Sequence, residues 1–250
     1  MPVFFVASNQ IHGGVVTITG SLHHHLKTSL RSQPGDELWI GDDQRRRYRV
    51  RLTGVRAREL TGQVVEERAG PPASTRPLIV GQALLKGDRM DWVIQKATEL
   101  GVAHIIPLMT GHSVVRPRLG RIQSQQERWQ RIALEAAQQS ERWDLAVVEQ
   151  PREVMRFFRE PPEASLRLVL AEPRHGTEQS QGLASIPLHE PAGSAVVLAI
   201  GPEGGWRDAE LTAASAAGFR SVSLGQRVLR AETATVAAVA VLQSRLGELG

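Results

Sequence analysis

The chain has 250 residues, a formal net charge of +4 and only 4% aromatic residues. This length is enough for one large domain or two modest ones, and the scarcity of aromatic residues predicts a core of Leu, Val, Ile and Ala. The sequence contains no cysteine. It therefore excludes thiolate nucleophiles and Cys-based zinc or iron–sulfur sites, and it fits a reducing compartment without requiring one.

The basic residues are nearly all arginines, since Lys27, Lys86 and Lys96 are the only lysines. The planar fork of arginine suits phosphates and base edges. A high-GC coding bias gives the same excess of arginine, so composition alone does not decide for a nucleic-acid partner. The start of the chain lacks a basic signal-like region, and no apolar run reaches the roughly 18 residues of a membrane span. We expect a soluble, cytoplasmic protein.

Residues 1–70 predict a small β-barrel domain. Alternating or apolar segments between turn residues predict one helix at 23–30 and strands at 15–19, 37–40, 48–52 and 60–65. A segment rich in proline and glycine follows at 71–77. It cannot continue a sheet, so it is typical of a linker.

Residues 78–250 predict a second domain in which strands and helices alternate. Strands are predicted at 78–84, 104–109, 166–171, 195–200 and 222–224, and helices at 88–100, 122–139, 208–217 and 232–246. This order indicates an α/β fold with a mostly parallel sheet covered on both faces. The first strand is not followed by G-x-G-x-x-G, and no G-x-x-x-x-G-K-[ST] motif occurs, so the usual dinucleotide and triphosphate loops are excluded.

The most informative stretch is 200–242, which contains two glycine-bearing loops. The first has the sequence GPEGG at 201–205, and the second has the sequence LGQRVLRAET at 224–233. Each follows an apolar strand and leads into a helix. Because glycine lets a ligand approach the backbone closely, two such loops can close around one small molecule at the carboxyl ends of neighbouring strands.

These two loops resemble the cofactor loops of the SPOUT superfamily of methyltransferases, which use S-adenosylmethionine (SAM), and both are similar to its RsmE branch. Three further segments resemble signatures of that family: KATELGV at 96–102, EAAQQSER at 135–142, and 24–36, which carries HHL, LR and PGD. The resemblance covers nearly the whole chain. It implies a trefoil-knotted SPOUT domain after a PUA-like β-barrel, a homodimer, and methylation of N3 of a uridine in 16S rRNA, within the assembled small subunit.

The resemblance and the glycine-bearing loops together predict where SAM binds. The glycines would present backbone groups to adenine and ribose, and apolar side chains would enclose the adenine ring. The alternative is that the glycines only make tight turns, and that Thr233 only caps the final helix. The predicted cofactor-binding residues are Leu170, Ile200, Gly201, Pro202, Glu203, Gly204, Gly205, Leu224, Gly225, Leu229 and Thr233.

Three side chains in the two loops are candidates for catalysis. N3 of uracil must lose a proton, and the charge then spreads onto O2 and O4, so the site needs a proton acceptor and a cation or N–H donor. Arg230 and Glu232 can supply these roles, and Glu203 is a competing acceptor. The alternative is that Arg230 and Glu232 merely pair at a helix start. Methylation at C5 through a thiolate adduct is excluded, because the chain has no thiol.

The resemblance places RNA contacts on the first domain, next to a dense run of arginines at 45–51. Such a run is usually a solvated face, but beside an RNA-facing domain we expect phosphate contacts. Two arginines further along would serve RNA or a partner's pocket, or else a salt-bridged helix. The predicted RNA-binding residues are His24, His25, Arg31, Arg45, Arg46, Arg47, Arg116 and Arg142.

The consecutive histidines at 23–25 could suggest a metal site, but consecutive side chains point in different directions. No carboxylate-rich motif accompanies them, so we expect no metal. Trp143 and Asp144 depart from the family, which often has a small residue and a proline there. Two other functions stay open: a SPOUT methyltransferase acting on tRNA ribose 2′-O, and a non-catalytic RNA-binding factor for ribosome assembly.

Overall fold

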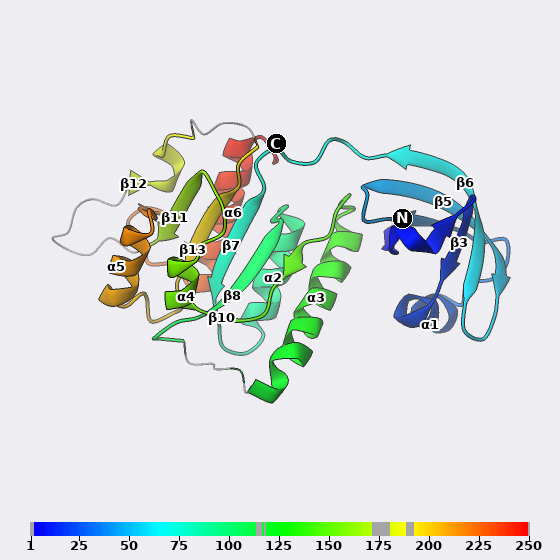
Figure 1. Cartoon of the computed structure of the whole chain (residues 1–250), viewed down its shortest axis with the longest axis horizontal. Helices are drawn as coiled ribbons and strands as arrows, with labels where there is room; N and C mark the ends of the chain where they lie inside the picture. The colour runs from blue at the N-terminus through cyan, green and yellow to red at the C-terminus, as the bar shows by residue number, and fades with distance from the viewer. Residues whose placement is uncertain (1–2, 114–116, 118, 172–180, 189–192, 250) are drawn as a thin grey trace. The chain divides into compact units, whose positions relative to one another are not determined.

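The computed structural model describes residues 3–113, 117, 119–171, 181–188 and 193–249. The chain divides into two compact units. The first contains residues 1–73 and 137–145, and the second contains residues 74–136 and 146–250. Figure 1 shows the helices and strands of both units. Residues 137–145, which the sequence analysis assigned to the second domain, therefore belong to the first unit.

The first unit is built on a six-stranded sheet with the order β1-β4-β5-β6-β3-β2. Its strands are β1 (Val3–Phe5), β2 (Ile11–His12), β3 (Val15–Ile18), β4 (Glu37–Gly41), β5 (Arg46–Val55) and β6 (Leu60–Ala69), and its helix is α1 (Gly20–Thr28). Only the pair β1–β4 is parallel. The four predicted strands and the helix are confirmed. The short strands β1 and β2 were not predicted, because so few residues show no periodicity.

The alternation along β5 sets the core of the first unit. Tyr48, Val50 and Leu52 are buried, and they belong to one hydrophobic cluster with residues of β3, β4 and α1. The intervening Arg49 and Arg51 lie on the other face of the strand, as the period of two requires.

The second unit is built on an eight-stranded sheet with the order β10-β8-β7-β13-β11-β14-β12, and β9 also pairs with β8. The strands are β7 (Leu78–Ala83), β8 (His104–Met109), β9 (Val147–Val148), β10 (Arg152–Glu153), β11 (Leu166–Leu170), β12 (Gln181–Gly182), β13 (Val196–Ile200) and β14 (Arg220–Ser223). The pairs between described strands are all parallel. The predicted parallel α/β fold is therefore confirmed.

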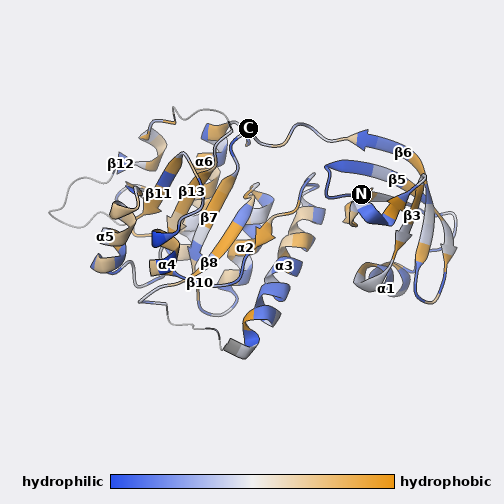
Figure 2. Cartoon of the chain, in the orientation of Figure 1, coloured by the Kyte–Doolittle hydropathy of each residue, from blue (hydrophilic) through white to orange (hydrophobic). Residues whose placement is uncertain are grey.

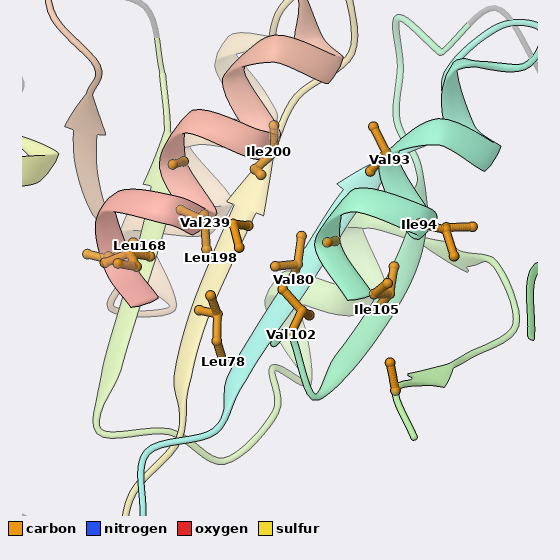
Figure 3. Close-up of a cluster of buried hydrophobic side chains, with 14 of the residues drawn as sticks. Leu78, Val80, Val93, Ile94, Val102, Ile105, Leu168, Leu198, Ile200 and Val239 are labelled. Atoms are coloured by element: carbon orange, nitrogen blue, oxygen red, sulfur yellow. The ribbon is translucent and has the colours of Figure 1, made fainter. Parts of the chain in front are cut away.

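Helices cover both faces of this sheet. The helices are α2 (Arg89–Glu99), α3 (Ile122–Gln139), α4 (Val154–Arg159), α5 (Asp208–Ala216) and α6 (Ala231–Leu246). Residues of α2, α3 and α6 form one cluster with one face of the strands, and residues of α4 and α5 form another cluster with the opposite face. Figure 3 shows Val93 of α2 and Val239 of α6 over the central strands.

The strand β13 shows why the centre of this sheet is largely apolar. Val196, Leu198 and Ile200 point to the α2 and α6 side, whereas Val197 and Ala199 point to the α4 and α5 side. All five residues are buried. A strand covered on both faces has no polar side, which explains the hydrophobic colouring of β13 in Figure 2. Across the described ranges, no helix combines the length and the apolar character that crossing a bilayer requires.

A buried pair of polar side chains, one on α6 and one on β7, joins this helix to this strand. Thr235 Oγ1 donates to Gln82 Oε1 (2.6 Å), and both side chains are fully buried. Thr235→Val should lower the free energy of unfolding of the second unit by about 1–3 kcal/mol, because Gln82 Oε1 stays buried without a donor. Denaturant unfolding measures this loss. The double variant Gln82→Met/Thr235→Val should cost less than the sum of the two single variants, and strict additivity would contradict the coupling.

Candidate functional site

A cavity of about 450 Å³ lies where β11, β13 and β14 end, between the two glycine-bearing loops. These three strands are neighbours in the order β13-β11-β14, so their carboxyl ends meet at one edge of the sheet. Ten of the eleven predicted cofactor-binding residues line the cavity: Leu170, Ile200, Gly201, Pro202, Glu203, Gly204, Gly205, Leu224, Gly225 and Leu229. The structure thus brings together residues from three separate stretches of the chain.

Two of the predicted loop residues do not line this cavity. Thr233 lies on α6 with an exposed side chain, and Glu232 precedes it in the first turn of the same helix. The cavity is lined instead by Arg230 and Ala231 at the start of α6. Arg116 lies outside the described residues.

The first loop packs against Trp206, which the sequence analysis did not single out. Trp206 lines the cavity, and its Nε1 donates to the carbonyl oxygen of Leu170 (2.8 Å). A Cβ atom on Gly201 would lie 3.1 Å from the indole ring, a contact tighter than ordinary side chains make. Glycine is therefore needed at 201 because the indole, fixed by its hydrogen bond, occupies the space of a side chain.

The far end of the first loop is held by the segment that follows β8. His112 Nδ1 donates to the carbonyl oxygen of Gly205 (3.1 Å), and a Cβ atom on Gly204 would lie 3.0 Å from that of His112. Gly205 has φ +70°, in the left-handed region that favours glycine. A side chain at either glycine would disturb the loop, so its backbone stays bare towards the cavity.

The buried carboxylate of Glu210 anchors the same segment to α5. It accepts from the backbone N–H groups of Gly111 (2.7 Å) and Arg207 (2.8 Å). Arg207 is the N-cap residue of α5. Glu210 thereby satisfies the N–H of Arg207 at the start of α5, where free N–H groups otherwise lack partners, and the N–H of Gly111 in the segment after β8.

The second loop brings positive charge to the cavity. Arg227 and Arg230 line it, both are exposed, and neither has a hydrogen-bond or ion-pair partner among the described residues. Gly225 has φ +104°, which favours glycine at this turn. The N-terminus of α6 lies at the same place and adds the positive end of its helix dipole. This part of the cavity suits a ligand or a transition state that carries negative charge.

The two candidate carboxylates share one arginine. Arg89 Nη1 donates to Glu203 Oε1 (2.9 Å), and Arg89 Nε lies 3.8 Å from Glu232 Oε1. Glu232 Oε2 is buried and has no hydrogen-bond partner among the described residues. The structure thus brings Glu203 and Glu232 together through Arg89, which the sequence analysis did not name.

Three of the predicted RNA-binding arginines have partners inside the first unit. Arg45 pairs with Asp144, and so does Arg142 (2.7 Å). Arg47 donates to the carbonyl oxygen of Arg142 (3.2 Å) and stacks over Trp143, 3.8 Å from the ring centroid. Burial lowers the pKa of Arg47. These contacts hold residues 137–145 in the unit and favour a structural role for all three arginines.

The arginines at positions 45–51 make up a basic hairpin, and those not yet described are paired with carboxylates on the surface of the first unit. Arg46 pairs with Glu67 (3.2 Å), and Arg51 pairs with Glu37 (2.8 Å). The hydrogen bond from Arg51 lowers the pKa of Glu37. Because exposed pairs of this kind exchange readily with water and salt, Arg46 stays available to a phosphate.

The predicted residues on α1 and just after it are exposed. His24, His25 and Arg31 face solvent, whereas His23 is buried and its Nε2 donates to the carbonyl oxygen of Arg56 (3.2 Å). His23 therefore has a structural role inside the first unit. In the described part of the chain, no three His, Cys, Asp or Glu side chains gather as a metal ion would require.

The fold and the cavity define an α/β protein that binds a small ligand at the carboxyl edge of a parallel sheet. Residues 72–243 match the family described as RNA methyltransferase domain. The chain belongs to this family, among the proteins named ribosomal RNA small subunit methyltransferase E. The resemblance to the RsmE branch is thereby confirmed.

Similar proteins cover nearly the whole chain. The ribosomal RNA small subunit methyltransferase E of Synechocystis sp. is 36% identical over 96% of this chain and 77% of its own. The enzyme of the same name from Neisseria gonorrhoeae, bound to S-adenosyl methionine, is 30% identical with a TM-score of 0.84, over 98% of both chains. A putative methyltransferase from Legionella pneumophila, in complex with SAM, is 30% identical with a TM-score of 0.86, over 97% of both chains.

Proposed function

We propose that this protein transfers a methyl group from SAM to N3 of a uridine in 16S rRNA of the small ribosomal subunit. The observation that carries the proposal is the cavity between the two glycine-bearing loops, lined by glycines, apolar side chains and arginines. The similar protein from Neisseria gonorrhoeae was crystallised with SAM, which supports the same ligand here.

The cavity fits SAM in size and in lining. Its volume of about 450 Å³ lies within the range of small-molecule sites. Leu170, Ile200 and Leu224 offer apolar walls to adenine, and at Gly201, Gly204 and Gly205 the backbone can approach a ligand without a side chain in the way. SAM, when bound, supplies a methyl group on a positively charged sulfur, which needs no metal to activate it.

The side chains around the cavity have the charges that methylation at N3 requires. Arg230 lines the cavity, and its proposed role is to stabilise the negative charge that develops on O2 and O4 of uracil when N3 loses its proton. Glu203 and Glu232 are the candidate acceptors of that proton. Much of the rate enhancement would come from holding uracil N3 in line with the methyl group, at the contact distance of a reactive pair.

The first unit would bind the RNA through its exposed basic residues. His24, His25, Arg31 and Arg46 are the contacts we propose there, and Arg116 is the contact we propose from the second unit. The variant His24→Ala/Arg31→Ala should bind small-subunit RNA more weakly and reduce the slope of log affinity against log salt by roughly one, because one phosphate contact is lost. Filter binding at several salt concentrations measures both. An unchanged slope would remove Arg31 from the interface.

We also propose that the protein acts as a homodimer, on the strength of its resemblance to the SPOUT superfamily. Sedimentation equilibrium of the free protein tests this directly. A single species with the mass of one chain, at the concentration used for activity, would contradict it.

Mass spectrometry of nucleosides tests the proposed reaction. Small subunits that lack the modification are incubated with the protein and SAM, and their RNA is digested to nucleosides. N3-methyluridine is the expected product. A 2′-O-methylated nucleoside after incubation with tRNA would indicate the other SPOUT specificity. No methylated product and no binding of SAM would favour a non-catalytic assembly factor.

A further inference from the structure

Arg89 contacts both segments that form the walls of the cavity, the loop 201–205 and the start of α6. It is the first residue of α2, which follows β7, and β7 pairs with β13. Its guanidinium contacts Glu203 in the first loop and Glu232 in the first turn of α6. These two carboxylates belong to two segments, the loop 201–205 and the start of α6, that both contribute residues to the lining of the cavity. One side chain from a third element therefore joins both.

The two contacts of Arg89 differ in strength. The pair with Glu203 is a direct hydrogen bond of 2.9 Å, whereas the nearest approach to Glu232 is an ionic contact of 3.8 Å. The Glu232 side chain is 15% exposed and that of Glu203 is 32% exposed. In the described part of the chain, Arg89 is the one cation within 4 Å of either carboxylate.

The single positive charge of Arg89 offsets the repulsion between the two carboxylates. Two carboxylates that share a site repel each other, and a cation between them cancels that repulsion. The planar fork of an arginine can serve two partners at fixed angles, whereas an ammonium acts as a point charge. Loss of the guanidinium would therefore release both carboxylates, and with them the loop 201–205 and the start of α6.

We propose that Arg89 is a positioning residue, whose single guanidinium holds Glu203 and Glu232 and thereby fixes the two walls of the cavity. The inference rests on the proposed function for its effect on catalysis. It does not make Arg89 a ligand of SAM, because Arg89 does not line the cavity.

The test compares three variants of the full chain. Arg89→Met removes the charge and keeps the length, and Arg89→Lys restores a charge without the fork. Arg156→Met is the matched control, because Arg156 forms an exposed pair with Glu160 (3.1 Å) on α4, on the opposite face of the sheet. Circular dichroism and thermal unfolding establish that all three are folded.

The first readout is hydrogen exchange on the free protein, without RNA. Arg89→Met should speed exchange of the hydrogen-bonded backbone amides of Gly205 and Ala234 by roughly tenfold, because local opening costs less free energy when the ion pairs of Arg89 are lost. Arg156→Met should leave these amides unchanged. Unchanged exchange in Arg89→Met would overturn the proposal, whatever the protein methylates.

The second readout is the rate of methyl transfer from radiolabelled SAM to small-subunit RNA, counted for all nucleosides together. Arg89→Met should lower kcat roughly 100-fold, as a small misplacement of reacting groups does, and should raise the Kd of SAM by no more than about tenfold, in line with the expected increase in local opening of the cavity walls. Arg89→Lys should recover part of that loss. A parallel loss of SAM affinity, or no recovery with lysine, would overturn the positioning role. Absence of methyl transfer by the wild-type protein would refute the proposed function and not the role of Arg89. In that case the hydrogen-exchange data would still show whether Arg89 holds the two segments in place.

Discussion

Gly201→Val should weaken the binding of SAM by roughly 100-fold or more, which corresponds to about 2.7 kcal/mol of binding free energy. A Cβ atom at this position would lie 3.1 Å from the ring of Trp206. The ring cannot move aside easily, since its Nε1 donates to the carbonyl oxygen of Leu170 and its face packs near Phe158, 5.8 Å between centroids. The branched side chain would therefore push the loop into the cavity that it lines.

Isothermal titration with SAM measures this effect directly. Gly120→Val is the matched control, because a Cβ atom on Gly120 meets no other atom within 4 Å and Gly120 lies on the 3₁₀ helix before α3. It should bind SAM as the wild type does. If Gly201→Val binds SAM within about threefold of the wild type, the cavity between the two loops is not the SAM site.

The cofactor loops could be predicted from sequence because their signal is local. The first loop follows the apolar strand β13 and the second follows the short strand β14, and each precedes a helix. Each loop contains glycines that the structure requires, at 201 and 205 in the first and at 225 in the second. Neighbouring parallel strands then place both loops at one edge of the sheet. The stretch 200–242 was therefore sufficient to place nine residues around one cavity, and the tenth, Leu170, comes from β11.

The interactions that the sequence did not reveal join residues far apart in the chain. Arg89 and Glu203 are separated by 114 positions, and Trp206 and Leu170 by 36. No spacing rule connects such residues, since only the order of the strands brings them together. Each pair includes at least one residue that lines the cavity. The contacts that could not be predicted therefore affect the shape and charge of the cavity, whereas its place in the fold could be predicted.

The basic hairpin shows the same limit in the first unit. A run of arginines in sequence suggests a free cationic surface, but strand pairing decides which charges are free. The register of β4 and β5 sets Arg51 opposite Glu37, and residues 137–145 bring Asp144 to Arg45. The trefoil knot is a different case, because it rests on the resemblance alone and no periodicity indicates it.

Arg230→Met should lower kcat roughly 100- to 1000-fold, as the loss of one group that stabilises a developing anion does. Arg230 lines the cavity, its side chain is exposed, and no described residue pairs with its guanidinium. It is the N-cap residue of α6, but its side chain makes no capping hydrogen bond. The substitution should therefore leave thermal stability and the Kd of SAM nearly unchanged.

Arg227→Met is the matched control for this prediction, because Arg227 lies in the same loop, lines the same cavity and is equally unpaired among the described residues. Its loss removes the same general attraction for RNA phosphates, which acts on KM more than on kcat. Single-turnover rates at saturating small subunits separate the two effects. A large fall in the rate for Arg227→Met with a normal rate for Arg230→Met would transfer the charge-stabilising role to Arg227. Equal, small effects would mean that the N-terminus of α6 and the backbone N–H groups of the loops carry the developing charge instead.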